Sequence, residues 1–151
     1  MLWISRYLLA RVAEDFGVSV SLEPKLFRDW NGAGCHTNFS TTTMRAGTGG
    51  MDYIHGLMKR LEAKHVFHIE LYGNNEKRLT GHHETSSQEV FSSGSGNRAA
   101  SIRIPTSTAA DNGRGYVEDR RPASDMDPYV VGAAIIDTTI LDESLIQPLY
   151  E

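Results

Sequence analysis

The sequence has almost no cysteine, no excess of basic charge and no long hydrophobic run. Its single cysteine, Cys35, excludes an internal disulfide framework and a zinc site built from several thiolates. Lys and Arg number 15 against 19 for Asp and Glu, a formal charge of −4, which argues against a nucleic-acid partner. No segment approaches the roughly 18 apolar residues of a membrane-spanning helix, so we expect no membrane partner either.

What is present is typical of a folded protein of ordinary size. The chain has 151 residues, of which 40% are hydrophobic and 23% are charged. Both fractions are close to globular averages, and the length suits one domain. The composition therefore predicts a soluble, cytoplasmic protein and says nothing about its chemistry.

The first half of the chain shows two clear periodicities. Apolar residues at helical spacing predict a core helix over residues 2–16, with Gly17 as its stop. Strict alternation over residues 18–22 predicts a strand that ends at Pro24. We expect a loop over residues 29–34 and a second strand over residues 35–43, whose polar face lines a site or solvent.

The second half mixes helical, extended and loop signals. Residues 51–65 predict an amphipathic helix, and residues 66–72 are either a helix or a short buried segment. Asp125 or Asp127, followed by Pro128, predicts the start of a helix over residues 129–141. The remaining segments are predicted as loops over residues 73–96 and 106–115 and as strands over residues 99–105 and 115–119.

Two segments place unusual residues in glycine-rich surroundings. Residues 31–36 form a turn with two glycines that delivers His36, which is either a metal ligand or a hydrogen-bonded core histidine. Residues 78–84 contain Arg78, His82, His83 and Glu84. This segment is either a polar mobile loop or a lid that brings in a carboxylate as general base.

Two further segments concentrate charge near strands. Arg98 and Arg103 differ in parity, so Arg98 should precede the strand that contains Arg103. Two arginines beside one cleft suit a polyphosphate, although structural ion pairs are the alternative. Residues 116–122 carry Glu118 and Arg120, which could serve a metal and an anionic substrate or merely form a solvated strand end.

The four segments together, in this order and spacing, resemble the glutamine synthetase family. Residues 31–41 are similar to its ATP-site signature, residues 78–85 to its flap, and residues 97–105 and 115–122 to its next two signatures. The resemblance extends from Leu2 to about Leu141 and is closest to the eukaryotic type. It implies an α+β fold: a partial catalytic domain with a curved antiparallel sheet, flanking helices and no β-grasp domain. On this basis residues 1–151 form one truncated domain, and residues 73–96 are its flexible flap and loop region.

The resemblance also implies a reaction and its participants. Glutamine synthetases join ammonium to L-glutamate with ATP through γ-glutamyl phosphate, and they use Mg²⁺ or Mn²⁺. The implied metal ligands are His36 and Glu118, and the implied catalytic residues are Glu84 and Arg98. The implied ATP-binding residues are Asn38, Phe39, Ser40, Arg98, Arg103, Tyr116 and Val117. The implied glutamate-binding residues are Trp30, Asn31, Gly32, Arg78, Arg98 and Arg120.

The sequence departs from the eukaryotic pattern at a few positions. Asp29 stands where an asparagine is usual and adds negative charge close to the implied glutamate site. Ser95 and Gly96 replace Val and Ala, and Thr106 replaces a basic residue. Compared with the family, the β-grasp domain and the first half of the catalytic domain, with its metal-binding glutamates, are absent from this sequence.

These absences lead to three hypotheses. The first is a glutamine synthetase polypeptide that is inactive alone because its metal affinity is poor. The second is a non-catalytic remnant or a partial gene model, and the third is an interaction module that co-assembles with full-length subunits. The family implies a homo-oligomer, a decamer in eukaryotes, and a mitochondrial form of a complete parent chain stays open. Lost strands should also leave an open sheet edge.

Overall fold

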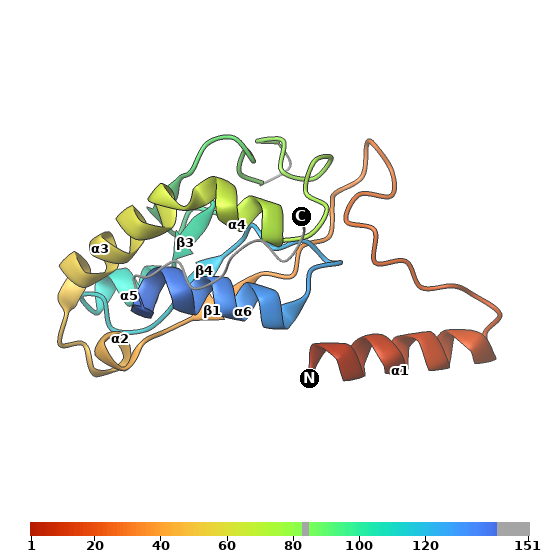
Figure 1. The fold of residues 1–151 in the computed structure, drawn as a ribbon, viewed down its shortest axis with the longest axis horizontal. Helices are drawn as coiled ribbons and strands as arrows, with labels where there is room; N and C mark the ends of the chain where they lie inside the picture. Colours follow the sequence, from red (N-terminus) through yellow and green to blue (C-terminus); the bar gives the residue numbers. More distant parts are fainter. Residues whose placement is uncertain (83–84, 142–151) are drawn as a thin grey trace.

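A four-stranded sheet lies at the centre of the computed structural model, which describes residues 1–82 and 85–141 (Figure 1). The strands are β1 (Thr37–Phe39), β2 (Ser93–Ser95), β3 (Ile102–Ile104) and β4 (Val117–Asp119), in the spatial order β1-β4-β3-β2. Strand β4 pairs antiparallel with β1 and β3, whereas β2 pairs parallel with β3. The prediction of an α+β fold is confirmed, but the sheet is mixed and not fully antiparallel.

The parallel pair arises because the chain doubles back between β2 and β3. Ser93 pairs with Ile102 and Ser95 with Ile104, so residues 96–101 must return to the start of β2. Gly96 makes the turn with a φ of +63°, a conformation that glycine adopts without a steric penalty. The Asn97 side chain accepts a hydrogen bond from the Ala99 N–H at 2.9 Å and closes the return.

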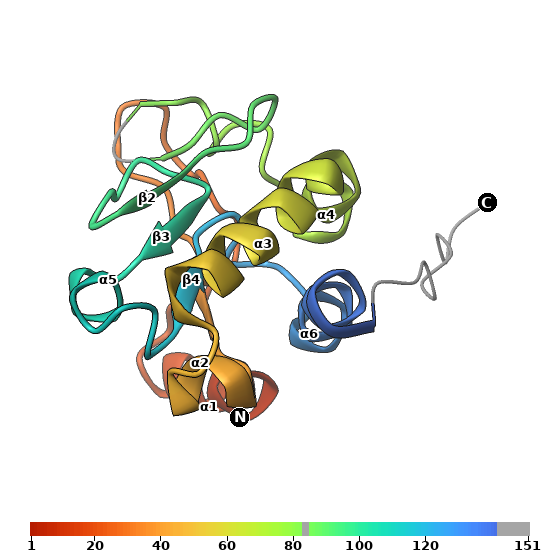
Figure 2. The same cartoon turned by 90° about the vertical axis from the view of Figure 1, so that its left-hand side faces the viewer.

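Helices α3 (Gly50–Ala63), α4 (His65–Leu71) and α6 (Pro128–Ile136) gather on one side of the sheet (Figure 2). The buried residues of α3 are Ile54, Leu57, Met58 and Leu61, which share one helical face. They pack against Ile102, Ile104 and Val117 of the sheet. A second cluster joins Tyr72 to Val131, Ala134 and Ile135 of α6. The helix predicted over residues 51–65 is confirmed, although it ends at Ala63, and residues 66–71 belong to helix α4, with Tyr72 as its C-cap.

The last helix begins as its sequence predicts. The Asp127 side chain accepts a hydrogen bond from the Tyr129 N–H at 2.8 Å, and Pro128 occupies the first turn. After Ile136 the chain continues as a π-helical segment, η1 (Asp137–Leu141). Asp127 is thus the N-cap, and Asp125 instead accepts from the Asn74 N–H at 3.1 Å.

Four sequence-based predictions are wrong in whole or in part. Residues 18–22, predicted as a strand, have no regular secondary structure and pair with no strand in the described part of the chain. The predicted strand over residues 35–43 stops early because Thr41 caps a short helix, α2 (Thr42–Ala46), by accepting from the Met44 N–H at 3.2 Å. The predicted loop over residues 106–115 contains another short helix, α5 (Thr106–Ala110), and β2 lies inside the predicted loop over residues 73–96.

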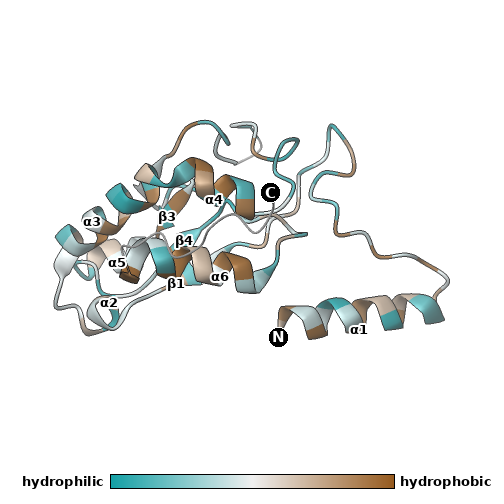
Figure 3. Ribbon diagram, viewed as in Figure 1, coloured by the Kyte–Doolittle hydropathy of each residue, from teal (hydrophilic) through white to brown (hydrophobic). Residues whose placement is uncertain are grey.

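Helix α1 (Leu2–Asp15) forms where it is predicted but not in the core. Its buried residues are Arg6 and Ala13, and Arg6 donates to the backbone carbonyl of Met126 at 2.8 Å. Leu2 packs partly against the core, but the other large apolar side chains are exposed, among them Tyr7 (63%) and Leu8 (53%). Figure 3 shows hydrophobic positions along this helix, which extends away from the sheet. Among the described residues, no helix is long and apolar enough to cross a membrane.

A buried polar network connects β4 to α4 and η1. The Arg121 guanidinium donates two hydrogen bonds to the Asp119 carboxylate, at 3.0 and 2.7 Å. The Tyr72 hydroxyl donates to the same carboxylate at 3.0 Å. His68 lies 2.5 Å from the Tyr72 hydroxyl and 2.8 Å from the Thr138 hydroxyl. Burial lowers the pKa of His68 to about 3, so its ring is neutral at physiological pH. Burial opposes ionisation of Asp119, but Arg121 outweighs it and holds the pKa of that carboxyl below its usual range.

Replacing Asp119 by asparagine should destabilise the fold strongly. The change leaves the fully buried Arg121 without its counter-charge, which should lower the free energy of unfolding by about 3–5 kcal/mol. The control is Glu14→Gln, which breaks the solvent-exposed Arg11–Glu14 pair and should cost at most about 1 kcal/mol. Chemical denaturation measures both, and equal losses in the two variants would contradict this role for Asp119.

Candidate functional site

Successive side chains of β4 point to opposite faces of the sheet, so Glu118 lies opposite Asp119. The alternation continues just beyond the strand, where Arg120 pairs with Glu118 and Arg121 pairs with Asp119. Glu118 pairs in register with Asn38 of β1 and with Arg103 of β3. Directly paired residues share a face, so these side chains form one polar surface. We call this surface, formed by His36, Asn38, Arg103, Glu118 and Arg120, the polar face.

Glu118 is the centre of the polar face. Its Oε1 lies 3.2 Å from His36 Nδ1, and its Oε2 accepts from Arg103 Nε at 2.5 Å. Arg120 Nη1 lies 3.4 Å from both oxygens. Burial opposes ionisation of Glu118, but Arg103 and Arg120 outweigh it and keep the pKa of the carboxyl below its usual range. The carboxylate is therefore ionised at physiological pH.

His36 stands beside this carboxylate as a neutral imidazole. Burial and then the charge of Arg120 lower its pKa, and Glu118 offsets them only in part. When Nδ1 carries the proton it donates to Glu118, which leaves Nε2 with a free lone pair. A neutral imidazole beside an ionised carboxylate is a donor pair that Mn²⁺ and Mg²⁺ can use. Among the described residues, however, no group of three or more His, Cys, Asp and Glu side chains could hold a metal ion.

The two glycines before His36 allow the chain to pass close to Arg78. A Cβ on Gly32 would lie 2.7 Å from Arg78 Cγ, and one on Gly34 would lie 2.8 Å from both Arg78 Nη1 and His36 Nε2. The absence of a side chain at these two glycines therefore makes room for a neighbouring side chain.

Arg78 itself is buried and bound to the backbone. Its Nε donates to Asn75 Oδ1 at 2.9 Å, and its Nη2 donates to the carbonyl of Pro122 at 3.2 Å and to that of Arg121. Burial and the charge of Arg120 lower the pKa of Arg78 to about 10. In this structure the guanidinium satisfies the carbonyl oxygens that follow β4.

The other residues implied by the resemblance are spread around this surface. Arg98 is exposed and precedes β3, as its parity predicts. Trp30 is exposed and packs against Phe27 with ring centroids 5.0 Å apart, and Asn31 follows it in the same loop. Tyr116 is exposed, whereas Phe39 and Val117 pack into the core, so only their main chains can face a ligand. Glu84 and His83 lie outside the described residues.

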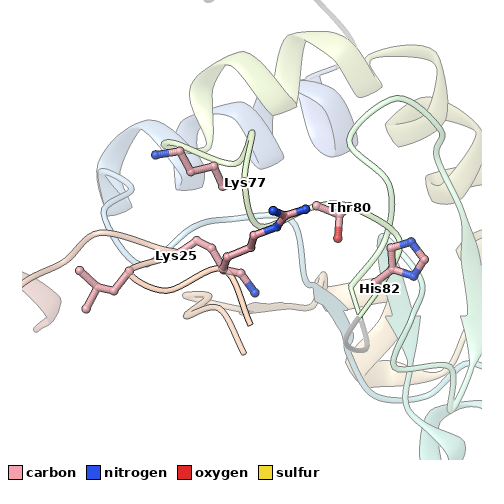
Figure 4. Close-up of a pocket in the computed structure, with 6 residues that line it drawn as sticks. Lys25, Lys77, Thr80 and His82 are labelled. Carbon is pink, nitrogen blue, oxygen red and sulfur yellow. The ribbon is translucent and has the colours of Figure 1, made fainter. Parts of the chain in front are cut away.

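Two larger pockets lie outside the polar face. One, of about 680 Å³, is lined by Lys25, Leu26, Arg28, Lys77, Thr80 and His82. Figure 4 shows that two segments line this pocket, one with Lys77, Thr80 and His82 and the other with Lys25. The second, of about 630 Å³, is lined by Ser40 with residues of α2, α3 and η1, including Arg45 and Arg60. Of the predicted site residues, only Ser40 lines either pocket.

Sequence reasoning did not identify the charged residues on the core side of β4. Asp119 and Arg121 lie within the charged segment 116–122, whose only charged residues with predicted roles are Glu118 and Arg120. The alternation of acid and base over residues 118–121 was the available signal, because a strand sends one pair to each face. His65, which contacts Arg121, carried no such signal.

The comparisons with known proteins agree with the four motifs. The family described as "Glutamine synthetase, catalytic domain" matches residues 1–141. The chain is 60% identical to the glutamine synthetase of Kluyveromyces lactis over 139 residues, which is 91% of this chain and 37% of that protein. It is 56% identical to that of Suillus bovinus over 144 residues, 94% of this chain and 40% of that protein. The chain thus spans about two-fifths of the length of these curated relatives.

Removing the charge of Arg120 should raise the pKa of His36. Arg120 is second only to burial among the causes that lower it, so Arg120→Met should move it toward the ordinary value of 6.5 without reaching it. Because the pKa of His36 is lower in the folded state, the folded state binds fewer protons there than the unfolded state. The free energy of unfolding of the parent should therefore decrease as the pH falls below 6.5, and that of Arg120→Met should decrease less.

Titration of the His36 ring signals by NMR measures this shift directly. The matched control is Arg11→Met, which removes an exposed charge on α1 and should leave the pKa of His36 unchanged. An unchanged or lower pKa in Arg120→Met would show that Arg120 does not act on the imidazole as described.

Proposed function

The chain belongs to the glutamine synthetase family, and we propose that its polar face serves the ATP-dependent ligation of ammonia to L-glutamate. In this reaction the γ-phosphoryl group of ATP passes to the γ-carboxylate of glutamate, which releases ADP. Ammonia then displaces phosphate from γ-glutamyl phosphate and loses a proton to give glutamine. The contact of His36 with Glu118, which joins two distant motifs at 3.2 Å, is the observation that carries the proposal.

The polar face fits a divalent cation in part. His36 and Glu118 offer an imidazole and a carboxylate, and Mg²⁺ commonly takes few protein ligands together with water and substrate phosphates. We propose that these two residues hold Mg²⁺ or Mn²⁺ with phosphate oxygens of ATP, where the cation would neutralise phosphate charge. Arg103 and Arg120, which already contact Glu118, hold the carboxylate in place.

The arginines supply the complementary positive charge. Arg98 and Arg103 are proposed to hold the transferring and leaving phosphates, since guanidinium groups bind such oxygens in pairs. For glutamate we propose Arg98, Arg120 and Arg78, the last only if it releases some of its backbone carbonyls. Trp30, Asn31 and Gly32 complete this proposed glutamate set.

The nucleotide contacts combine side chains with main chain. We propose that Asn38, Ser40 and Tyr116 use their side chains, because all three have accessible surface. Phe39 and Val117 would contribute backbone groups, since their side chains pack into the core. For Glu84 we propose that it excludes water from the acyl phosphate and helps to deprotonate ammonium.

We propose that the chain does not complete this reaction alone. With only two protein ligands among the described residues, His36 and Glu118, the polar face should hold a divalent cation weakly. The chain also spans only about two-fifths of its curated relatives. The resemblance further supports a cytoplasmic location and a homo-oligomeric assembly, and both are part of the proposal.

Mn²⁺ with ATP should bind weakly to the purified chain without forming glutamine. Paramagnetic broadening should centre on the His36 ring signals, and Glu118→Gln should weaken it by about tenfold or more because a ligand is lost. Glu89→Gln, a change at an exposed glutamate, is the control and should leave the broadening as in the parent.

The expected metal site and the expected lack of activity are contradicted by different results. Broadening that Glu118→Gln does not weaken would place the metal elsewhere and overturn the proposed site. Formation of glutamine that requires ATP and ammonium, and that Glu84→Ala abolishes, would overturn the proposal that the chain is inactive alone.

The exposed side of α1 favours a second candidate function, co-assembly with full-length glutamine synthetase subunits. Large apolar side chains are about half exposed or more along this helix, at Ile4, Tyr7, Leu8, Leu9 and Val12. Contiguous apolar surface of this kind marks protein contacts. A subunit of the same family is the proposed partner, because the curated relatives extend well beyond the matched region and offer surface that this chain lacks.

Co-expression with a full-length subunit should give a complex that elutes as one species in size-exclusion chromatography. Leu8→Lys should disrupt it by placing a charge within the apolar surface. Asp15→Asn, which changes the net charge by the same amount on the same helix, should leave it intact. Failure of the parent chain to co-elute, or equal behaviour of the two variants, would remove this candidate.

A further inference from the structure

His65, the first residue of α4, lies between the end of β4 and the loop after residue 78. Its Nδ1 is 3.1 Å from Arg121 Nη1, and its Nε2 is 3.1 Å from the backbone carbonyl oxygen of Gln88. The side chain is buried, and its ring meets the ring of Phe91 edge-on with centroids 5.7 Å apart. One imidazole thus bridges two segments that are 33 positions apart in the sequence.

The two partners allow only one protonation pattern. A guanidinium can only donate, so Nδ1 must accept from Arg121; a carbonyl oxygen can only accept, so Nε2 must carry the hydrogen. The ring is therefore the neutral Nε2–H tautomer. Burial and the charge of Arg121 both lower the pKa of His65, and the Gln88 carbonyl and Asp119 only partly offset them. The neighbouring His68 is neutral as well.

Gln88 is part of a short ladder that closes the loop. Its N–H donates to the Leu79 carbonyl at 3.1 Å, and the Gly81 N–H donates to the Ser86 carbonyl at 3.2 Å. Thr80 and Ser87 form a bridge between these two bonds. Leu79 is buried, so the ladder is anchored at one end. The contact with His65 is made at this same end.

Arg121, the other partner, is held firmly. Asp119 binds it with two hydrogen bonds, and its guanidinium stacks over the rings of Tyr72 and Phe91 at 5.2 and 5.6 Å. It directly follows Arg120 of the polar face. A rigid donor just after β4 therefore fixes the imidazole, and the imidazole fixes the carbonyl of Gln88.

We propose that His65 is a positioning residue that sets the place of the 79–88 ladder relative to the end of strand β4. It does so by accepting one hydrogen bond and donating another through opposite sides of one ring. The two hydrogen bonds of His65 support this role without reference to any reaction. An effect of His65 on ligation rests on the proposed function, because Arg78 and Glu84 belong to the same stretch of sequence.

Two variants separate hydrogen bonding from simple packing. His65→Gln keeps an acceptor and a donor on one terminal amide, whereas His65→Leu keeps apolar bulk and loses both. Amide hydrogen exchange in the full chain should be about tenfold faster at Gly81 and Gln88 in His65→Leu, as expected when the hydrogen bond that holds the Gln88 carbonyl is lost. His65→Gln should return both rates to within about threefold of the parent.

Amides of α3 serve as the internal reference and should exchange at unchanged rates in both variants. In the parent chain, ¹⁵N NMR of the His65 ring should show a protonated Nε2 and an unprotonated Nδ1. This spectroscopic signature needs no substitution, so it stays informative if His65→Leu does not fold.

Three results would overturn the proposal: unchanged exchange at Gly81 and Gln88 in His65→Leu, equal rates in the two variants, or a ring protonated at Nδ1. None of these measurements uses a metal or substrate. Failure of the positioning role is therefore distinguishable from failure of the proposed ligase function, which the Mn²⁺ experiment tests.

Discussion

The alternation of charge at the end of β4 is the constraint on which the rest of the structure depends. Residues 118–121, which run from β4 into the segment just after it, place an acid and a base on each side of the chain. Glu118 and Arg120 form the centre of the polar face, and Asp119 and Arg121 are buried among helices. Because an unpaired buried charge is costly, the core must keep the second pair intact, and this requirement fixes the backbone that presents the first pair.

The buried pair also organises elements that are distant in the sequence. Tyr72, at the end of α4, donates to Asp119, and His68 connects Tyr72 to Thr138 in η1. His65 connects Arg121 to Gln88 in the loop that follows. A polar network satisfied in this way gives a unique arrangement to a core that apolar packing alone would specify less sharply. The backbone that carries the polar face is therefore held in one arrangement by this network.

Local patterns predicted the elements that depend on local physics. The spacing of Ile54, Leu57 and Leu61 defined α3, and Asp127 with Pro128 defined the start of α6. The parallel pairing of β2, the absence of a strand at residues 18–22 and the burial of Arg78 were not predictable in this way, because each depends on partners far along the chain. The contact of His36 with Glu118 was anticipated only through resemblance to a family, since no local pattern brings residues 36 and 118 together.

Under the proposed function, β4 and the two residues after it bind ligand on one side and support the fold on the other. NMR signals of the arginine Nε–H groups report on both faces during titration of the full chain with Mg²⁺–ATP. The signals of Arg103 and Arg120, on the polar face, should shift, while that of Arg121 in the core should stay in place. A shift of Arg121 equal to the others, or a titration in which neither Arg103 nor Arg120 responds, would contradict the account.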